Sequence, residues 1–170
     1  MASAGGRAIS ETEFGRLLEG LLERSGAYAR SLLRDREDAD DAVQQAALRA
    51  LSRLAHYDPE RPFAGWWFAI LRNACMDVCR ARRPAVATDR ADAIADRAGD
   101  RGARREDWEE LAAALARVGP DHEEILRLRY FGELSYDQIA AALSIAPGTV
   151  MSRLHYARKA LAAAMERTTP

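Results

Sequence analysis

Apolar residues recur every three or four positions along most of the chain, in segments bounded by capping residues, glycine and proline. This spacing is typical of amphipathic helices. Strands would need runs of β-branched and aromatic residues bounded by turns, and the sequence has no convincing run of that kind. The predicted fold class is therefore all-α. The predicted helices span residues 11–33, 36–55, 63–82, 108–118, 121–130, 135–143 and 147–161, with a break or bend at Ser25-Gly26 in the first.

The last two predicted helices form a helix-turn-helix pattern. Ser135 and Gln138 make a capping box that starts the first helix, and Pro147 suits the first position of the second. The second helix has an apolar seam, made of Val150, Leu154, Ala157 and Leu161. The residues that flank this seam or point away from it are Thr149, Met151, Ser152, His155, Tyr156 and Lys159. This arrangement favours a helix that lies in a DNA groove, although an ordinary helical hairpin would show the same periodicity.

Two arginines extend this predicted DNA-binding face. Arg153 and Arg158 border the apolar seam, where long side chains can follow the surface and reach phosphates. Phosphate contacts position a protein on DNA without reading its sequence. The formal net charge of the whole chain is only −1, which argues against a protein that coats nucleic acid through bulk electrostatics. Any DNA contact must be local or supported by a partner.

The predicted helix over residues 36–55 has two unlike faces. One face is apolar and carries Val43, Ala46, Ala47, Ala50, Leu51 and Leu54. The other carries Asp38, Asp41, Ala42, Gln45, Leu48 and Arg49. Acidic residues near a helix N-terminus are favourable in any helix, but that effect does not explain an outward leucine. Leu48 beside Asp41 and Gln45 indicates a docking surface for a basic partner helix, although single exposed leucines are common.

The predicted helix over residues 63–82 combines aromatic and basic side chains. Its core face carries Trp67, Leu71, Ala74 and Val78, and a second face carries Trp66, Ile70, Asn73, Asp77 and Arg80, with Arg72, Met76 and Arg83 beside it. Aromatic rings near arginines are suited to holding single-stranded nucleic acid, because bases stack on rings and the backbone needs positive charge. The alternative is that the tryptophans belong to the core and the arginines only solvate the helix end. We prefer the core interpretation for Trp67 and the nucleic-acid interpretation for Asn73 and Arg80.

The segment from 85 to about 104 alternates Ala, Asp, Arg and Gly and cannot bury enough apolar surface to fold alone. We therefore predict two small helical domains, residues 1–83 and 105–170, joined by a flexible linker over 84–104. The N-terminus lacks a signal-peptide core and no window is long enough to span a bilayer, which predicts a cytoplasmic protein without membrane insertion.

Neither a metal site nor an active site is predicted. Cys75 and Cys79 lie four residues apart without a nearby histidine or further cysteine, so we expect both to be packing residues. The three histidines are scattered, with no nucleophile or metal-binding set around them. We expect no enzymatic activity and no cofactor.

Taken together, these segments resemble a sigma factor of the extracytoplasmic-function (ECF) group of the sigma-70 family. The segments that carry the resemblance are Asp38-Ala39-Asp40-Asp41-Ala42-Val43-Gln44, Trp66-Trp67 with Ile70-Leu71-Arg72-Asn73, Asp77 and Arg80, and Gly132-Glu133-Leu134-Ser135-Tyr136 with Ile139-Ala140, Gly148-Thr149-Val150, Ser152-Arg153-Leu154 and Ala157-Arg158. Their order along the chain matches that of the family. The resemblance implies a protein that binds core RNA polymerase, recognises two promoter elements and opens the minus-ten region.

The resemblance also implies roles for individual residues. Those expected to contact the β′ clamp helices of core polymerase, which the protein binds together with the β subunit, are Asp38, Asp41, Gln44, Gln45, Leu48 and Arg49. Those expected at the minus-ten element are Tyr57, Arg61, Trp66, Arg72, Asn73, Arg80 and Arg83, with Asn73 close to a base turned out of the non-template strand and residues 57–63 forming the wall of its pocket. Those expected at the minus-thirty-five element are Thr149, Met151, Ser152, Arg153, His155, Tyr156, Arg158 and Lys159.

The sequence departs from the family pattern at several of these positions. Gln45 stands where a glutamate is frequent, and Trp67 replaces the usual leucine. Met151 and Tyr156 occupy recognition-helix positions that are often basic, so the promoter preference of a relative does not transfer.

Two other functions remain as alternatives. One is a stand-alone helix-turn-helix regulator that binds operator DNA as a dimer, which leaves the acidic 38–44 segment unexplained. The other is a sigma mimic that sequesters an anti-sigma protein, which has no need to keep Asn73 and Arg80. An anti-sigma factor is also an expected partner of a sigma factor itself.

Overall fold

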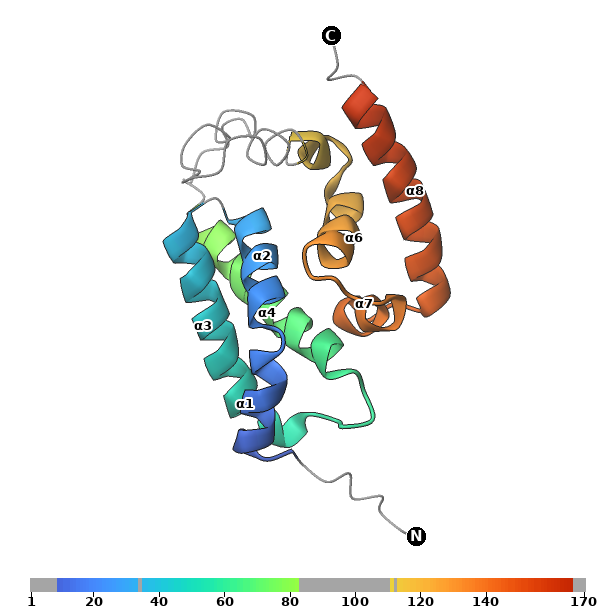
Figure 1. The fold of residues 1–170 in the computed structure, drawn as a ribbon. Coiled ribbons are helices and arrows are strands. Elements are labelled where there is room, and N and C mark those ends of the chain that lie inside the picture. The colour runs from blue at the N-terminus through green and yellow to red at the C-terminus, as the bar shows by residue number, and fades with distance from the viewer. Residues whose placement is uncertain (1–8, 34, 83–110, 112, 167–170) are drawn as a thin grey trace.

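The structure, a computed structural model, describes residues 9–33, 35–82, 111 and 113–166. All the elements in these ranges are helical, as the sequence predicts (Figure 1). The helices are α1 (Glu11–Glu19), α2 (Leu22–Leu32), α3 (Arg36–Ser52), the short 3-10 helix η1 (Leu54–His56), α4 (Phe63–Ala81), α6 (Pro120–Tyr130), α7 (Tyr136–Leu143) and α8 (Pro147–Glu166). In the described ranges, no helix is long and apolar enough to cross a membrane.

The first two helices divide at a different place from the one predicted. The chain breaks at Gly20, which ends α1, and α2 then runs without interruption through Ser25 and Gly26. The predicted break at Ser25-Gly26 is therefore wrong. The backbone N–H of Ser25 makes the helical hydrogen bond to the carbonyl of Leu21 at 2.9 Å. Its hydroxyl donates to the same carbonyl at 2.7 Å and accepts from the indole N–H of Trp67 at 2.8 Å. The small residue at this point thus lets α4 approach α2, which is a reason that local sequence does not reveal.

Helix α3 packs on α4 through a stripe of alanines. Ala39, Ala42, Ala46 and Ala50 are all fully buried, and small side chains of this kind allow two helices to approach closely. Two predicted positions on α3 are wrong as a result: Ala42 faces the core, and Leu51 is 40% exposed. Helix α4 contributes Trp67, Phe68 and Leu71 to the core, each fully buried, so Trp67 is a core residue as predicted.

The C-terminal helices begin where the local signals predict. Gly119 adopts a φ of 89° directly before Pro120, and Ser135 and Gln138 form a complete capping box at the start of α7. Ser144 ends α7 in the left-handed conformation, and the turn from Ser144 to Ala146 leads into α8 at Pro147. Val150, Leu154 and Ala157 are fully buried, which confirms the predicted seam of α8.

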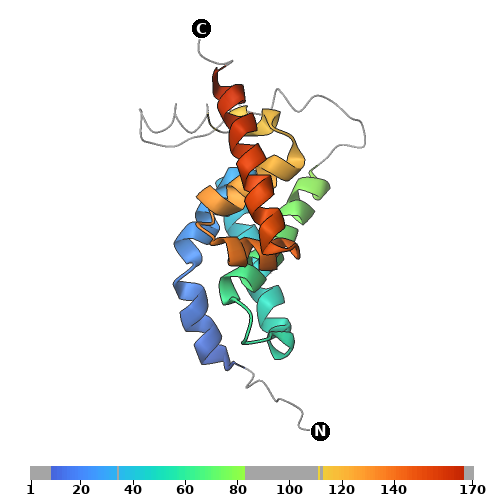
Figure 2. The same cartoon turned by 90° about the vertical axis from the view of Figure 1, so that its right-hand side faces the viewer.

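The N-terminal helices and the C-terminal helices share one continuous apolar core. Figures 1 and 2 show α7 lying against α4, with α8 on the outer side. The predicted linker falls in residues 83–110, outside the part of the chain that the structure describes, so the domain boundaries remain predictions.

Candidate nucleic-acid interface

Helix α8 presents its predicted DNA-contacting residues to solvent. Met151 and Tyr156 are 59% and 61% exposed, and Ser152, His155 and Lys159 are exposed as well. Thr149 and Arg153 are half-buried at the edge of the same face. The rings of His155 and Tyr156 lie edge to face with centroids 5.4 Å apart, so the two side chains form one aromatic ledge. The outward face that periodicity predicts is therefore present.

The Arg158 guanidinium lies against two tyrosines. Its Nε donates to the hydroxyl of Tyr130 at 3.1 Å, and an Nη donates to the hydroxyl of Tyr136 at 3.5 Å. These hydrogen bonds, that from Tyr130 first, raise the pKa of Arg158 above its ordinary value. Arg129 stacks its guanidinium over the Tyr136 ring at 5.6 Å. Tyr130 and Tyr136 are not among the residues predicted to contact DNA, because they lie in α6 and α7 and the periodicity of α8 does not reveal contacts with other helices.

The aromatic residues at the start of α4 form a cluster with the preceding loop. Trp66 is half-buried, with its ring centroid 4.8 Å from that of Tyr57 and 5.7 Å from that of Phe63. Tyr57 is only 7% exposed, and its hydroxyl donates to the backbone carbonyl of Arg61 at 2.7 Å. Burial, followed by the nearby Asp58 and Glu13 carboxylates, raises the pKa of Tyr57. The loop over 57–63 is thus fastened to α4, while the Arg61 side chain remains exposed.

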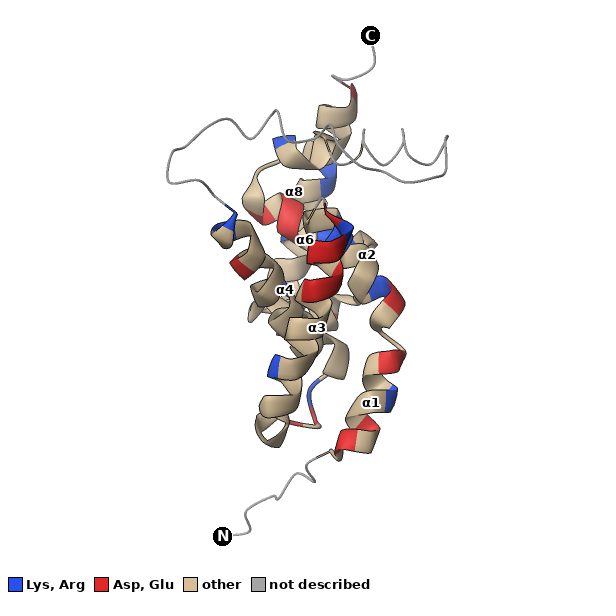
Figure 3. Ribbon diagram, turned by 90° about the vertical axis from the view of Figure 1, so that its left-hand side faces the viewer, with Lys and Arg blue, Asp and Glu red and all other residues tan. Residues whose placement is uncertain are grey.

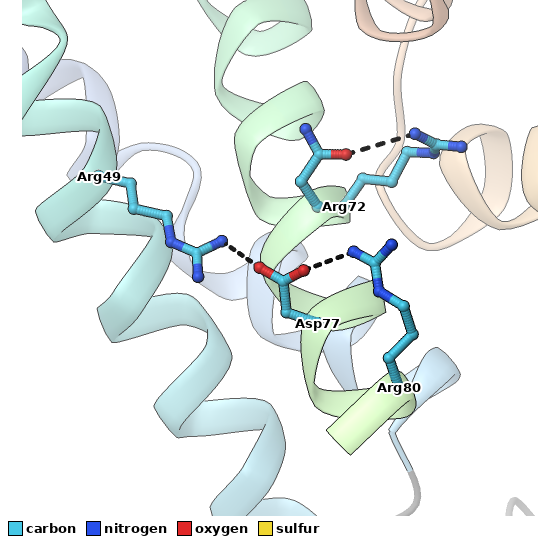
Figure 4. Close-up of polar contacts among 5 residues, drawn as sticks. Arg49, Arg72, Asp77 and Arg80 are labelled. Atoms are coloured by element: carbon cyan, nitrogen blue, oxygen red, sulfur yellow. Dashed lines mark hydrogen bonds and ion pairs between the residues drawn. The ribbon is translucent and has the colours of Figure 1, made fainter. Parts of the chain in front are cut away.

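The polar face of α4 carries three of the predicted minus-ten residues. Asn73 is exposed, and its side-chain oxygen accepts a 3.5 Å hydrogen bond from Arg72 (Figure 4). Arg72 also pairs with Glu124 of α6, from the other half of the molecule. Arg80 is exposed at the far end of α4. Arg83, also predicted at this site, lies outside the described residues.

Asp77 joins α4 to α3. Its two carboxylate oxygens accept from Arg49 of α3 at 2.6 Å and from Arg80 at 2.5 Å (Figure 4). The hydrogen bond from Arg49, then that from Arg80, lowers the pKa of Asp77. One carboxylate therefore links a residue predicted at the polymerase surface to a residue predicted at the DNA surface. The sequence places Asp77 on the face with Arg80, but it does not reveal the contact with Arg49, 28 positions away.

The predicted polymerase-binding residues lie along one side of α3. Asp41, Gln44, Gln45 and Leu48 are exposed, Leu48 by 69%. Asp38 is turned toward α4, where its carboxylate pairs with Arg82 and the side chain is only 19% exposed. Figure 3, which views this side of the molecule, shows the acidic residues that lie on it. An apolar groove runs beside them, lined by Phe14, Gln44, Ala47, Leu48 and Leu51.

The cysteines lie in the body of α4. Cys75 is fully buried, and burial raises the pKa of its thiol to about 12, so the reactive thiolate is disfavoured. Cys79 is half-buried. Among the described residues, no three histidine, cysteine or acidic side chains come together in a group that could hold a metal ion.

In the described residues, an all-helical fold presents an exposed face on α8, an aromatic cluster at the start of α4 and an exposed polar surface on α3, a combination that suits a protein with both DNA and protein partners. The sequence matches the Sigma-70 region 2 family over residues 18–84 and the Sigma-70 region 4 family over residues 108–161. It is 34% identical to the ECF RNA polymerase sigma factor SigL of Mycobacterium tuberculosis strain H37Rv, over 95% of this chain and 94% of that protein. It is 35% identical to the ECF RNA polymerase sigma factor EcfG of Rhodopseudomonas palustris, over 81% of this chain and 76% of that protein.

Solved structures agree with these sequence relatives. CnrH in complex with the cytosolic domain of CnrY superposes with a TM-score of 0.71 at 26% identity, over 93% of this chain and 90% of CnrH. The sigma factor RpoE in complex with the anti-sigma factor NepR from Bartonella quintana gives a TM-score of 0.66 at 25% identity, over 91% of this chain and 98% of RpoE. The chain belongs to the sigma-70 family, in its group of ECF RNA polymerase sigma factors, which confirms the resemblance found in the sequence.

Proposed function

We propose that the chain is a promoter-recognition subunit that joins core RNA polymerase in the cytoplasm, contacts promoter DNA at two elements and opens the nearer one. The observation that carries this function is the identity of 34% with an ECF sigma factor across 95% of the chain. The protein acts through binding alone, because strand opening here requires captured bases and no reaction of the protein's own. No cofactor takes part.

Helix α8 is proposed to read the minus-thirty-five element. A major groove admits an α-helix, and side chains on its exposed face reach base edges there. Met151 and Tyr156 supply apolar and aromatic contacts, which favour recognition of thymine methyl groups and sugar edges over guanine. Arg158, held by Tyr130 and Tyr136, supplies a positioned cation for the phosphate backbone.

Helix α4 and its preceding loop are proposed to hold the minus-ten strand. Turning a base out of the duplex costs a few kcal/mol, so a surface that captures the extruded base converts binding energy into strand separation. Exposed Asn73 supplies an amide that pairs with a base edge, and the Tyr57, Phe63 and Trp66 cluster supplies an aromatic wall. Arg61, Arg72, Arg80 and Arg83 supply positive charge for the strand.

Helix α3 is proposed to bind the β′ clamp helices of core polymerase. The exposed surface of α3 has polar and apolar parts, formed by Asp41, Gln44, Gln45 and Leu48. The groove beside it can accept an apolar side chain of the partner. Asp38 and Arg49 are held by Arg82 and Asp77, so they shape the border of this surface.

An anti-sigma protein is proposed as a further partner, because two of the solved relatives, CnrH and RpoE, were determined in complex with the cytosolic domain of CnrY and with the anti-sigma factor NepR. The mimic alternative is less favoured, since the chain keeps an exposed Asn73 and an exposed recognition helix that sequestration alone does not need. The stand-alone regulator is less favoured because the family likeness includes the α3 and α4 surfaces.

Asn73→Ala tests the proposed strand opening. We expect the holoenzyme with this variant to bind duplex promoter DNA normally but to form about tenfold fewer open complexes, a loss of ~1.4 kcal/mol. Permanganate reactivity of unpaired thymines measures opening, and filter binding at low temperature measures the closed complex. Met76→Ala, on the same helix and 39% exposed, is the matched control and is expected to match the wild type. Equal loss of both complexes with Asn73→Ala would remove the proposed role.

A further inference from the structure

Asp77 of α4 accepts hydrogen bonds from two arginines that belong to different helices. Its Oδ2 atom accepts from an Nη of Arg49, in the last turn of α3, at 2.6 Å, and its Oδ1 atom accepts from an Nη of Arg80, in the last turn of α4, at 2.5 Å (Figure 4). A guanidinium carries five N–H donors in a fixed plane, and each of these contacts uses one nitrogen atom. Both arginines can therefore bind a second partner while Asp77 holds them in place.

The three side chains of this contact lie at the surface. The side chain of Asp77 is 42% exposed, that of Arg49 is 37% exposed and that of Arg80 is 66% exposed. Exposed ion pairs contribute little to stability, because water and salt screen the charges and long side chains lose freedom when they pair. The packing of α3 on α4 depends instead on the buried alanine stripe of α3 and the apolar core residues of α4. The contact is therefore more important for binding than for folding.

The two arginines lie on the two surfaces that carry the proposed function. Arg49 is expected at core polymerase and Arg80 at the minus-ten strand. Asn73, which is proposed to pair with an extruded base, lies four positions before Asp77 and so on the same face of α4. A partner that binds a mobile arginine must immobilise a long side chain, which costs part of the binding free energy. A carboxylate that already orients the guanidinium reduces this cost.

We propose that Asp77 is a positioning residue for both surfaces, which orients Arg80 toward the phosphates of the minus-ten strand and Arg49 toward core polymerase. The inference rests on the proposed function and adds a residue that acts through its two neighbours. At DNA the carboxylate has two opposing effects, because its charge repels phosphates while its hydrogen bond orders Arg80. The repulsion acts between exposed charges, which water and salt screen, whereas the hydrogen bond is a direct contact. We expect the positioning effect to be the larger of the two.

Asp77→Ala separates positioning from charge. The substitution removes both hydrogen bonds and the negative charge, and alanine favours the helix. If charge alone mattered, open-complex formation would improve. Positioning predicts that it falls by about fivefold, since Arg80 must then be ordered by the DNA itself. Permanganate reactivity of the holoenzyme measures opening, at a promoter recovered by transcription of a library with the wild-type protein.

The matched control is Asp40→Ala. It also removes one carboxylate from an exposed ion pair with an arginine, that between Asp40 and Arg36. We expect this variant to match the wild type in opening and in binding to core polymerase. If Asp77→Ala loses helical circular dichroism, Asp77→Asn takes its place, because asparagine keeps the size of the side chain.

Double-mutant cycles show which arginine carries each effect. Asp77→Ala should no longer weaken opening in an Arg80→Gln background, and it should no longer weaken core binding, measured by fluorescence anisotropy, in an Arg49→Gln background. A purely structural defect would lower both affinities in every background. Asp77→Ala should also lower the slope of the salt dependence of opening by about 0.7, the value for one phosphate contact on a single strand. Additive losses in the cycles, or stronger opening with Asp77→Ala, would overturn the positioning role.

Failure of the proposed function gives a different result. If Arg49→Gln and Arg80→Gln match the wild type, the arginines contact neither partner, which refutes their assignment together with the role of Asp77. If they weaken binding while Asp77→Ala with intact helices does not, only the positioning role is overturned. Recovery of no promoter with the wild-type protein would refute the proposed function, and the role of Asp77 with it.

Discussion

The recognition helix α8 and the polar face of α4 differ in how their predicted DNA-contacting residues are presented. On α8, Met151 and Tyr156 are more than half exposed. On α4, Arg72 pairs with Glu124, and Trp66 is packed with Tyr57 and Phe63. A helix that reads duplex DNA needs only exposed side chains. A surface that captures a single strand needs side chains that packing and hydrogen bonds hold in a fixed shape. The difference is the one that the two proposed tasks require.

The two helices also differ in the size of their buried side chains. Trp67, Phe68 and Leu71 of α4 are fully buried and belong to the apolar core that both halves of the molecule share. The buried side of α8 contains smaller residues, Val150, Leu154 and Ala157. We therefore expect α4 to be the element on which the whole fold depends, and α8 to tolerate more change.

The largest expected effect is a loss of stability when the buried side chains of α4 and α8 are truncated. Trp67→Ala removes a fully buried indole and its hydrogen bond to Ser25, and we expect a loss of about 3–5 kcal/mol in the free energy of unfolding. Val150→Ala, in the buried seam of α8, removes less volume and should cost about 1–3 kcal/mol. Urea denaturation followed by circular dichroism measures both. A smaller loss for Trp67→Ala than for Val150→Ala would contradict the ranking of the two helices.

The next effect concerns the α3 surface that flanks α4. Reversing the charge of exposed Asp41 should weaken binding to core polymerase by about tenfold, or ~1.4 kcal/mol, because it places like charges opposite a basic partner surface. Fluorescence anisotropy with labelled protein and core enzyme measures this affinity. Asp40→Arg is the matched control, since Asp40 pairs with Arg36 at an exposed position on the same helix. Equal effects of the two substitutions would argue against a specific docking face.

A substitution of Asp38 adds a second variant to the same experiment. Asp38 pairs with Arg82 and is 19% exposed, so its charge reversal combines a change at the surface with repulsion inside the protein. We expect Asp38→Arg to reduce both thermal stability and core binding, whereas Asp41→Arg reduces core binding alone. Differential scanning fluorimetry separates the two contributions. A variant of Asp38 with unchanged stability would show that its ion pair with Arg82 contributes nothing.

A smaller effect is expected at Arg158, whose guanidinium donates hydrogen bonds to Tyr130 and Tyr136. Tyr130→Phe removes the hydroxyl that accepts from Arg158 and leaves the ring, so duplex binding should weaken by about 1 kcal/mol or less. The loss should be similar for all promoter sequences, because a phosphate contact carries no base information. Tyr156→Phe, on the exposed base-reading face, is the comparison. Loss of sequence preference with Tyr130→Phe would assign the tyrosine to base reading instead.

The smallest expected effect is a pH dependence at Asp77. Arg49 and Arg80 lower its pKa in the folded protein, so its contribution to stability is complete above the unfolded pKa of about 3.9 and is lost as the pH falls through the folded pKa. Asp77→Asn should therefore flatten the acid side of the stability profile and leave the slope near neutral pH unchanged. Thermal melts between acid and neutral pH measure it. An unchanged acid slope would show that Asp77 is not coupled to folding.

The sequence predicts those parts of the fold that local interactions determine. Ser135 with Gln138, Gly119 before Pro120, and Pro147 mark helix ends through hydrogen bonds or backbone angles within a few residues, and the structure confirms each of them. The predicted break at Ser25-Gly26 is wrong because Ser25 serves a tertiary contact inside α2, where its hydroxyl accepts from Trp67, a residue 42 positions away.

Contacts between distant residues are the part that periodicity does not predict. Arg72 and Glu124 are 52 positions apart, and the close approach of Gly65 in α4 to Ala141 in α7 depends on the relative placement of two helices. The residues of the α8 face were predictable because one seam on one helix defines them. The sequence does not predict which side chains on the polar face of α4 are exposed, since this depends on how α6 and α7 pack against α4.

In vitro transcription with bacterial core polymerase on a promoter library tests the central claim most directly. Sequencing of the transcript 5′ ends is expected to reveal start sites that require the added protein and share two upstream elements at a fixed spacing. The Asn73→Ala variant should use the same start sites less efficiently. Failure of the protein to associate with core polymerase at low salt, together with a transcript pattern identical to that of core polymerase alone, would contradict the account.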